Sequence, residues 1–218
     1  ALFGSSGTYK TVKANEPLSF EARESETLAI VGESGCGKST FAKVLMGLET
    51  ATDGGILLDN ENIGSTPIEA RDTQTVADIQ MVFQNPFDTL NPSMTVGRQI
   101  VRALEVFKYG QSDDERNDRM LQLLDLVKLP RAFATRMPRQ LSGGQKQRIG
   151  IARAMYANSE IIIFDESTSA IHEDSETKIF NNLKSLKNKT IIFVTHRKKI
   201  KNFCDKLYQI EQKDLKQY

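Results

Sequence analysis

The feature that most constrains the fold is a glycine-rich loop, residues 32–39, with the sequence GESGCGKS. It matches the pattern G-x-x-x-x-G-K-[ST] in full. An apolar run, residues 28–31, precedes the loop, and four apolar residues recur at helical spacing after it, Phe41, Val44, Leu45 and Leu48. The order strand, glycine loop, helix is the context in which this pattern binds phosphate. The alternative is a tight glycine turn that binds nothing.

The residue types in the loop suit a polyphosphate ligand. Glycines at 32, 35 and 37 allow positive φ and direct successive backbone N–H groups at phosphate oxygens, and a helix beginning near Lys38 adds a partial positive charge. Lys38 is expected to reach the β and γ phosphates, and the Ser39 hydroxyl to ligate Mg²⁺. Cys36 fills a variable position as a small neutral residue. The predicted nucleotide-binding loop comprises Gly32, Glu33, Ser34, Gly35, Cys36, Gly37, Lys38, Ser39 and Thr40.

A second chemical feature is the acidic end of the apolar segment IIIFDE, residues 161–166. A buried central strand would deliver Asp165 and Glu166 at its carboxyl end, beside the phosphate loop. Asp165 is predicted to hold the Mg²⁺ shell through hydrogen-bonded water, and Glu166 to accept a proton from, or orient, the water that attacks the γ phosphate. Taken alone, the pair could equally be solvated acids at a strand end.

The remaining patterns predict the fold class. Short apolar clusters within residues 9–31, then the segments at 54–63, 78–87, 160–166 and 190–196, predict strands, and residues 141–158 predict a helix. Residues 95–107 and 114–129 have helical periodicity, with Asp113 or Asp114 as the expected cap. We therefore predict an α/β P-loop NTPase core with a mostly parallel sheet, an N-terminal antiparallel β subdomain and an inserted helical subdomain. The chain, residues 1–218, is expected to be one domain, with the insertion at about 88–140.

Charge and hydropathy argue against nucleic-acid-binding, membrane-spanning and exported proteins. Lys and Arg number 29 against 28 for Asp and Glu, so no large positive field favours nucleic acid. No run of about 18 apolar residues occurs, and the first residues lack the charged and apolar regions of a signal peptide, so we expect a chain that neither spans a membrane nor is exported. Cys36 and Cys204 show no ligand spacing and are predicted to be thiols.

The segment LSGGQ, residues 141–145, resembles the nucleotide-binding subunits of ABC transporters. Ser142 can cap the following helix, while Gly143 and Gly144 leave backbone amides exposed, so the motif is a second candidate phosphate-binding helix start. Leu141 and Gln145 complete the motif. The alternative is an ordinary helix cap beside a glycine turn.

The resemblance extends over nearly the whole chain and implies further roles. Gln84 in MVFQNP matches the Q-loop glutamine, which contacts Mg²⁺ or the attacking water, and His196 in FVTH matches the switch histidine that contacts the γ phosphate. By chemistry alone, a lone His after an apolar strand is more often a structural hydrogen-bonding group. Tyr9 lies where the family places an aromatic residue that stacks on adenine. Phe3 competes for this role, and Tyr9 could instead be an ordinary strand aromatic.

More narrowly, GESGCGKST, FQNPFDTLNPSMTVGRQI and LSGGQKQRIGIARA resemble the ATPase subunits of the dipeptide, oligopeptide and nickel importers. This implies an ATP- and Mg²⁺-dependent ATPase that powers an importer for peptides, nickel or a metal chelate. The implied partners are transmembrane permease subunits, a second ATPase subunit (identical or different) placed head to tail and, indirectly, an extracytoplasmic substrate-binding protein, with no nucleic acid. The implied location is peripheral, on the cytoplasmic face of the cell membrane.

Three alternatives stay open: a soluble ABC-type ATPase outside transport, a regulatory subunit that binds ATP with weak turnover and, more distantly, a P-loop kinase or GTPase. The chain also departs from the family pattern. Ser167 replaces a proline, and Ala170, Ile171 and His172 stand where the family has an Ala-Leu-Asp loop that crosses the dimer interface. Arg197 follows His196 where the importer group often has Asp. Family members commonly continue well beyond the switch histidine, so functions of that extension are expected to be absent.

Overall fold

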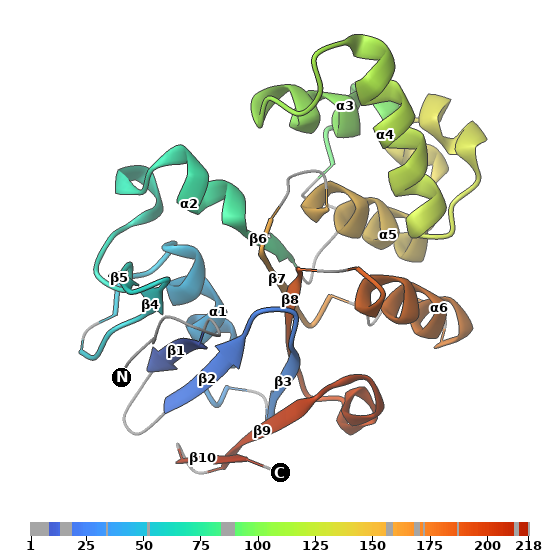
Figure 1. Cartoon of the computed structure of the whole chain (residues 1–218). Coiled ribbons are helices and arrows are strands. Elements are labelled where there is room, and N and C mark those ends of the chain that lie inside the picture. Colours follow the sequence, from blue (N-terminus) through green and yellow to red (C-terminus); the bar gives the residue numbers. More distant parts are fainter. Residues whose placement is uncertain are drawn as a thin grey trace. The chain divides into compact units, whose positions relative to one another are not determined.

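The computed structural model describes residues 9–13, 19–33, 35–51, 53–83, 90–155, 159–167, 171, 173–186, 188–211 and 214–217, and it describes side chains from Phe20 to Ile210, apart from Glu173 and Lys198 within these ranges. The chain divides into two compact units (Figure 1). The first contains residues 1–81, 160–166 and 187–218, and the second contains residues 82–159 and 167–186.

The chain begins with three strands, and three of its α-helices, α3, α4 and α5, follow one another between β6 and β7. The strands are β1 (Tyr9–Lys13), β2 (Ser19–Arg23), β3 (Thr27–Gly32), β4 (Leu57–Leu58), β5 (Glu61–Asn62), β6 (Ile79–Val82), β7 (Ile161–Asp165), β8 (Thr190–Thr195), β9 (Lys206–Glu211) and β10 (Asp214–Gln217). The α-helices are α1 (Lys38–Met46), α2 (Thr73–Asp78), α3 (Val96–Val106), α4 (Asp113–Leu126), α5 (Gly143–Ala154) and α6 (Glu173–Lys184). Short 3₁₀ helices are Ile68–Ala70, Arg131–Thr135, Pro138–Gln140 and Lys198–Phe203.

A six-stranded sheet in the order β10-β9-β3-β8-β7-β6 organises the first unit. The pairs β3–β8, β3–β9 and β7–β8 are parallel, and β9–β10 is antiparallel. The strands β7 and β8 are buried throughout, and β3 along all but its last residue, because their sequences are almost continuously apolar. The pairs β1–β2 and β4–β5 are antiparallel. The predicted mostly parallel sheet and the N-terminal antiparallel strands are confirmed.

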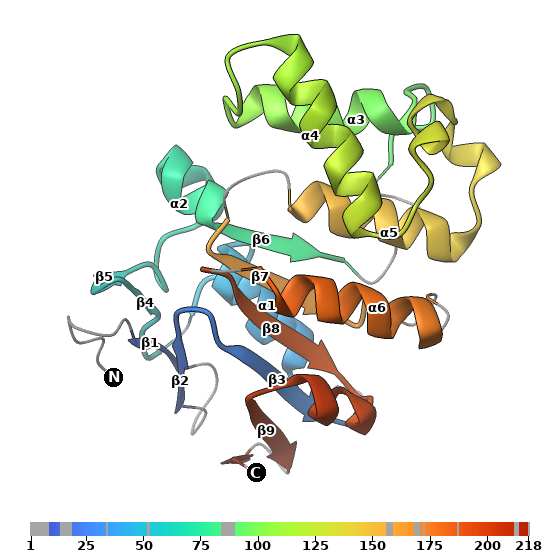
Figure 2. The ribbon, with the colours of Figure 1, turned by 45° about the vertical axis from the view of Figure 1, so that its right-hand side comes forward.

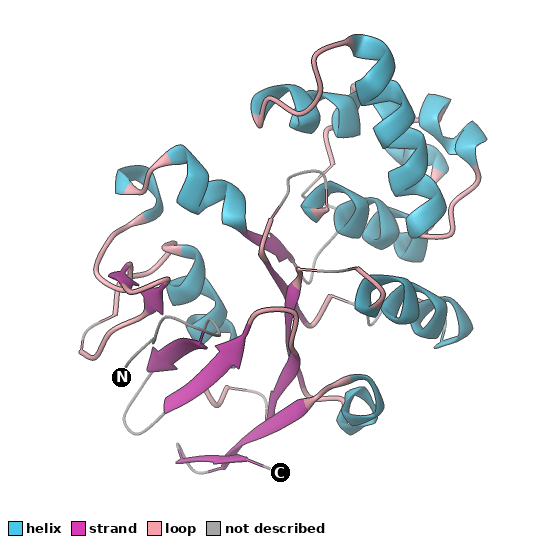
Figure 3. Cartoon of the chain, viewed as in Figure 1, coloured by secondary structure: helices cyan, strands magenta, loops and turns pink. Residues whose placement is uncertain are grey.

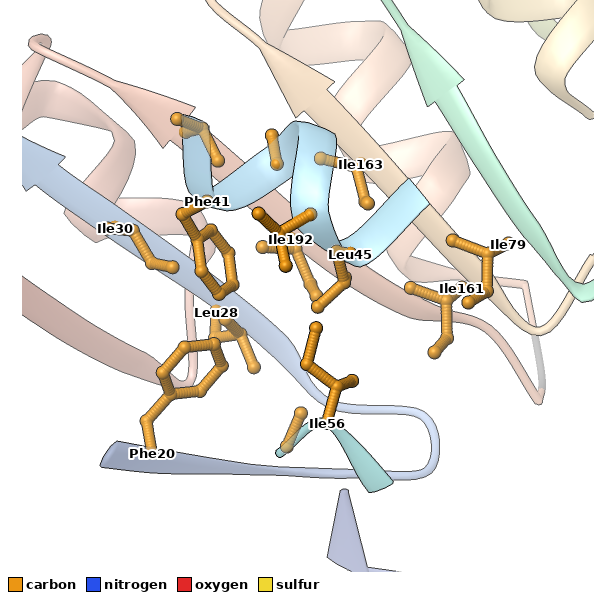
Figure 4. Packing of buried hydrophobic residues seen from close by; sticks show 14 of the residues in the cluster. Phe20, Leu28, Ile30, Phe41, Leu45, Ile56, Ile79, Ile161, Ile163 and Ile192 are labelled. Carbon is orange, nitrogen blue, oxygen red and sulfur yellow. The ribbon is translucent and has the colours of Figure 1, made fainter. Parts of the chain in front are cut away.

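The core of the first unit lies between α1 and the sheet. Helix α1 packs on β3, β7 and β8 (Figure 2). Figure 4 shows Phe41 and Leu45 of α1 directed at apolar residues of the strands. The ring centroids of Phe20 and Phe41 lie 5.2 Å apart, so β2 packs on the same core. The helix ends at Gly47, whose φ of 78° is the left-handed conformation of a glycine C-cap.

The second unit is built mainly from helices (Figure 3). Its α3 and α4 fall within the segment predicted to be helical, and α3 begins after Thr95, whose side chain accepts a hydrogen bond from the Arg98 amide. The predicted cap of α4 is wrong. Ser112, not Asp113 or Asp114, is the N-cap, and its hydroxyl accepts from the Glu115 amide. The two aspartates instead occupy the first turn, where they complement the positive end of the helix.

None of the helices in the described part of the chain has the length and hydropathy needed to cross a bilayer. Cys36 and Cys204, both described, are not disulfide-bonded, as the sequence predicts.

Candidate functional site

Two of the three glycines of the phosphate loop, Gly35 and Gly37, adopt the positive φ that the sequence predicts, whereas Gly32 does not. Gly35 and Gly37 have φ of 81° and 100°, a region that favours glycine, and Gly37 is the N-cap of α1. A Cβ on Gly32 would lie 2.6 Å from the Cys36 sulfur and 3.1 Å from the carbonyl oxygen of Ile210. Positive φ at Gly35 and Gly37, and the close approach of Cys36 and Ile210 to Gly32, therefore favour glycine at these three positions.

Lys38, the first residue of α1, is almost fully buried, with 4% of its surface exposed. Its ammonium group donates to the carbonyl oxygens of Gly32 at 2.9 Å and Glu33 at 2.7 Å, and it lies 3.6 Å from the Cys36 sulfur. The fold of the loop therefore keeps this cation among the loop's own backbone groups. An ammonium group in this position supplies the positive charge that the sequence assigns to phosphate binding.

The Ser39 hydroxyl donates a hydrogen bond to Asp165, with Oγ and Oδ1 3.1 Å apart. Burial raises the pKa of Asp165 above its ordinary value and nearby Glu166 adds to this, while the Ser39 bond and the charges of Lys38 and Lys43 oppose the rise. A hydroxyl and a carboxylate are the hard oxygen ligands that Mg²⁺ prefers, and Mg²⁺ is usually held by few protein groups together with substrate phosphates. These two residues therefore fit the predicted Mg²⁺ site.

Glu166 and His196 lie next to each other at the ends of neighbouring strands. Glu166 follows β7, and its N–H donates to the Val194 carbonyl oxygen of β8 at 2.8 Å. Its φ of 46° is left-handed, so the backbone turns directly after the strand. The carboxylate Oε1 lies 3.3 Å from His196 Nδ1. The His196 side chain is 59% exposed and that of Glu166 20%, so both are accessible to solvent.

The parallel topology explains why residues distant in sequence meet here. Strands β3, β8 and β7 are consecutive neighbours in the sheet, so their carboxyl ends share one edge. The first unit thus brings together five predicted site residues, Lys38, Ser39, Asp165, Glu166 and His196.

The LSGGQ motif belongs to the second unit, where it forms the start of α5. The Ser142 hydroxyl accepts from the Gln145 amide at 3.3 Å, and the Gln145 side-chain oxygen accepts from the Ser142 amide at 2.9 Å. This reciprocal capping box confirms the predicted helix cap. Gly143 and Gly144 are the first two residues of the helix, and Leu141 is buried beside it.

Several predicted residues lie outside the described part of the structure. They are Phe3, Ser34, Gln84, Ala170, His172 and the side chain of Tyr9. Their roles stay predictions.

Sequence reasoning missed Arg71, which fixes the far end of the phosphate-loop helix. Its guanidinium donates to the carbonyl oxygens of Leu45 at 2.8 Å, Thr66 at 3.0 Å and Ile63 at 3.0 Å. Burial lowers the pKa of Arg71. The guanidinium also occupies the space that a Cβ on Gly47 would need. No pattern predicts these contacts, because the acceptors are backbone carbonyls distant in the sequence.

The geometry defines a P-loop nucleotide-binding site in an α/β fold, and comparison with known proteins narrows the class. The family model described as ABC transporter matches residues 15–169. The chain is 41% identical over 189 residues to the oligopeptide transport ATP-binding protein OppF of Bacillus subtilis (85% of this chain, 62% of the relative), and 41% identical over 191 residues to OppF of Escherichia coli (86% and 57%). The chain belongs to the ABC transporter family.

Solved structures agree with this assignment. The dimeric post-hydrolysis state of the ATP-binding cassette MJ0796, bound to ADP and Pi, superposes with a TM-score of 0.80 at 30% identity, covering 96% of this chain and 95% of that one. A second dimeric structure of MJ0796, described as a bacterial ABC transporter cassette, has the same TM-score at 31% identity and the same coverage. The chain covers 95% of each MJ0796 structure and 57–62% of the length of the OppF relatives named above.

Proposed function

We propose that the chain is an ATP-binding and ATP-hydrolysing subunit that powers an ABC importer for oligopeptides. One observation carries the catalytic part of the proposal: two polar pairs, Ser39 with Asp165 and Glu166 with His196, lie at the carboxyl ends of adjacent strands. A tight glycine turn that binds no ligand would need neither of these pairs. The oligopeptide substrate is supported by the names of the relatives, whereas nickel or a metal chelate has no such support.

In this proposal each group has a distinct task. The loop amides and Lys38 bind the β and γ phosphates of ATP. Ser39 and Asp165 would hold Mg²⁺, which supplies charge neutralisation and fixes the phosphates when bound. Glu166 accepts the proton of the attacking water or orients it, and His196 Nδ1, 3.3 Å away, holds that carboxylate in place and contacts the γ phosphate. Gln84 is assigned to the Mg²⁺ or the attacking water, and Tyr9 to adenine.

The proposed assembly rests on the second candidate phosphate-binding site, the LSGGQ motif at the start of α5. The amides of Gly143 and Gly144 at the start of α5 would bind the γ phosphate of an ATP held by a facing subunit, so two cassettes would close head to tail around two nucleotides. The dimeric state of the MJ0796 structures supports this arrangement. We propose a single cassette with a helical subdomain at about 88–140, which would contact the permease subunits at the cytoplasmic face of the membrane, with a substrate-binding protein outside.

The test is the variant Glu166→Gln, studied by light scattering with and without ATP and Mg²⁺, beside ATPase assays of wild type. The matched control is Glu160→Gln, because Glu160 immediately precedes the first residue of β7 whereas Glu166 immediately follows its last. We expect wild type and Glu160→Gln to hydrolyse ATP, and Glu166→Gln to lose turnover and double in mass only with ATP. A monomeric Glu166→Gln that binds ATP would indicate an obligate different partner. A wild type that binds ATP without turnover would favour the regulatory subunit and overturn the proposal.

A further inference from the structure

Arg148, in the second turn of α5, joins the start of that helix to the chain that follows α4. Its Nε donates to the carbonyl oxygen of Gly144 at 3.3 Å, and its Nη1 donates to the carbonyl oxygen of Lys128, 20 positions earlier, at 3.0 Å. Helices α4 and α5 pack on each other within the second unit. One guanidinium therefore ties a glycine of the LSGGQ motif to the end of a neighbouring helix.

The chain after α4 forms a closed turn that can serve as an anchor. The Lys128 N–H donates to the Asp125 carbonyl oxygen at 3.0 Å, and the Leu129 N–H donates to that of Leu124 at 2.9 Å, which is a Schellman motif. Lys128 has a left-handed φ of 57°, a conformation that a residue other than glycine adopts only where its surroundings hold it. The motif leaves the Lys128 carbonyl oxygen to accept from Arg148.

The start of α5 needs an anchor because its first two residues are Gly143 and Gly144. Glycine has more backbone freedom than any other residue, and it costs about 1 kcal/mol relative to alanine inside a helix. The capping box of Ser142 and Gln145 fastens the first turn only to itself. Backbone amides bind an anion best when they are held in place before it arrives. Arg148 links this first turn to a separate part of the unit.

The charges at the start of α5 are the reverse of those at the start of α4. The first turn of α4 contains Asp113, Asp114 and Glu115, whereas none of the residues in the first turn of α5, all of them described, is acidic. A cation bonded to the first turn of a helix opposes the helix dipole, and burial also lowers the pKa of Arg148. The stability of α5 alone therefore does not explain this guanidinium, but an anion at the start of the helix would.

We propose that Arg148 is a positioning residue for the phosphate-binding start of α5. Its guanidinium fixes the Gly144 carbonyl relative to the Lys128 carbonyl, so that the amides of Gly143 and Gly144 are in place before the γ phosphate of a facing subunit arrives. This inference rests on the proposed function, because it requires the start of α5 to bind that phosphate. Arg148 itself is assigned no contact with ATP.

The test is Arg148→Met in a Glu166→Gln parent, measured by light scattering across an ATP titration with Mg²⁺. The matched control is Asn182→Leu, because Asn182 Nδ2 of α6 donates to another carbonyl oxygen at the end of α4, that of Leu126, at 2.8 Å. Both variants should melt about 2–6 °C below the parent, since each removes a side-chain donor from a backbone carbonyl. Only Arg148→Met should raise the ATP concentration for half-maximal doubling of mass, by at least about fivefold.

Two further measurements separate positioning from charge and from general damage. Arg148→Lys keeps the charge but not the planar fork, so it should also need at least about threefold more ATP than the parent. This variant carries the test if Arg148→Met does not fold. ADP binds to the phosphate loop but has no γ phosphate, so the Kd for ADP should stay within about twofold of the parent in every variant.

The outcomes separate this inference from the proposed function. An Arg148→Met protein that doubles in mass at the ATP concentration of the parent, or an Asn182→Leu protein with an equal shift, would overturn the positioning role. Full activity of Arg148→Lys, or a parallel loss of ADP affinity, would overturn it too. If the Glu166→Gln parent itself stays monomeric with ATP, the proposed homodimer fails and this inference fails with it, whereas ATP hydrolysis by wild type tests the ATPase function independently.

Discussion

The hydroxyl of Ser39 and the carboxylate of Asp165 form a hydrogen bond of 3.1 Å across 126 positions of sequence. Ser39 is in the first turn of α1, and Asp165 ends β7. They can meet because β3, which leads into the phosphate loop, is separated from β7 by one parallel strand, β8. The sheet topology thus places two oxygen ligands suited to Mg²⁺ side by side.

We expect Ser39→Ala to reduce Mg²⁺-supported ATP turnover by on the order of tenfold or more, because it removes a metal ligand and the bond that orients Asp165. Ser39→Thr keeps the hydroxyl and should retain most turnover. Titration of Mg²⁺ in the ATPase assay checks both, with Ser39→Ala needing more Mg²⁺ for half-maximal rate. Identical Mg²⁺ curves for wild type and Ser39→Ala would contradict the assignment.

The pKa of Asp165 predicts a pH-dependent stability. Burial raises that pKa, so between the ordinary carboxyl value and the folded-state value the folded protein binds more protons than the unfolded chain. The free energy of unfolding of wild type therefore falls as pH rises through this window. Without nucleotide or metal, Asp165→Asn should melt at a higher temperature than wild type at pH 7, and the difference should shrink towards pH 4.

Thermal unfolding of both proteins between about pH 4 and pH 8 measures this directly, because the unfolded-state pKa of Asp is about 3.9. The variant should also lose Mg²⁺-supported ATP turnover, since an amide is a poorer metal ligand than a carboxylate. An Asp165→Asn protein that melts below wild type at pH 7, or whose advantage grows as pH falls, would contradict the expected sign.

The sequence predicts the parts of this protein that local pattern determines. The phosphate loop, the buried strands and the Ser142 cap depend on nearby residues, and each is found where expected. The cap of α4 was mispredicted because Ser112 and the aspartates after it are all good N-cap residues, and local pattern does not decide between them.

Other features depend on contacts between distant segments. Strand β9 pairs with β3 on the side away from β8, and the segment KLYQIE carries no long apolar run that would predict a strand there. Helix α6 was not predicted either, because its sequence is largely polar. The contacts of Arg71 and Arg148 are made with backbone carbonyls, which no side-chain pattern shows.

Arg71 is expected to contribute strongly to stability. Arg71→Leu should lower the free energy of unfolding by about 2–3 kcal/mol, because at least three backbone carbonyls lose a charged donor. Arg71→Lys should recover only part of this, since an ammonium group cannot reproduce the planar fork. The control is Arg98→Leu, which removes an exposed pair with Glu105 and should cost at most about 1 kcal/mol. Chemical denaturation measures all three, and equal losses for Arg71→Leu and Arg98→Leu would contradict the expectation.

Ser142 has two separable roles, a helix cap in the structure and a phosphate contact in the proposal. Ser142→Ala removes the hydroxyl that accepts the Gln145 amide, so we expect the free energy of unfolding to fall by about 1 kcal/mol. Asp is as good an N-cap as Ser and its charge suits the helix N-terminus, so Ser142→Asp should retain wild-type stability.

The effects of the two variants on ATP-driven doubling of mass should be in the opposite order to their effects on stability. In the Glu166→Gln background, Ser142→Asp places a carboxylate where the γ phosphate of the facing subunit would bind, so ATP-driven doubling of mass should be lost through charge repulsion. Ser142→Ala leaves the amides of Gly143 and Gly144 in place, so doubling should persist at higher ATP concentration. Light scattering across an ATP titration distinguishes the cases. If Ser142→Asp, at wild-type stability, still doubles in mass at the same ATP concentration, then the start of α5 does not bind the phosphate and the head-to-tail arrangement must be abandoned.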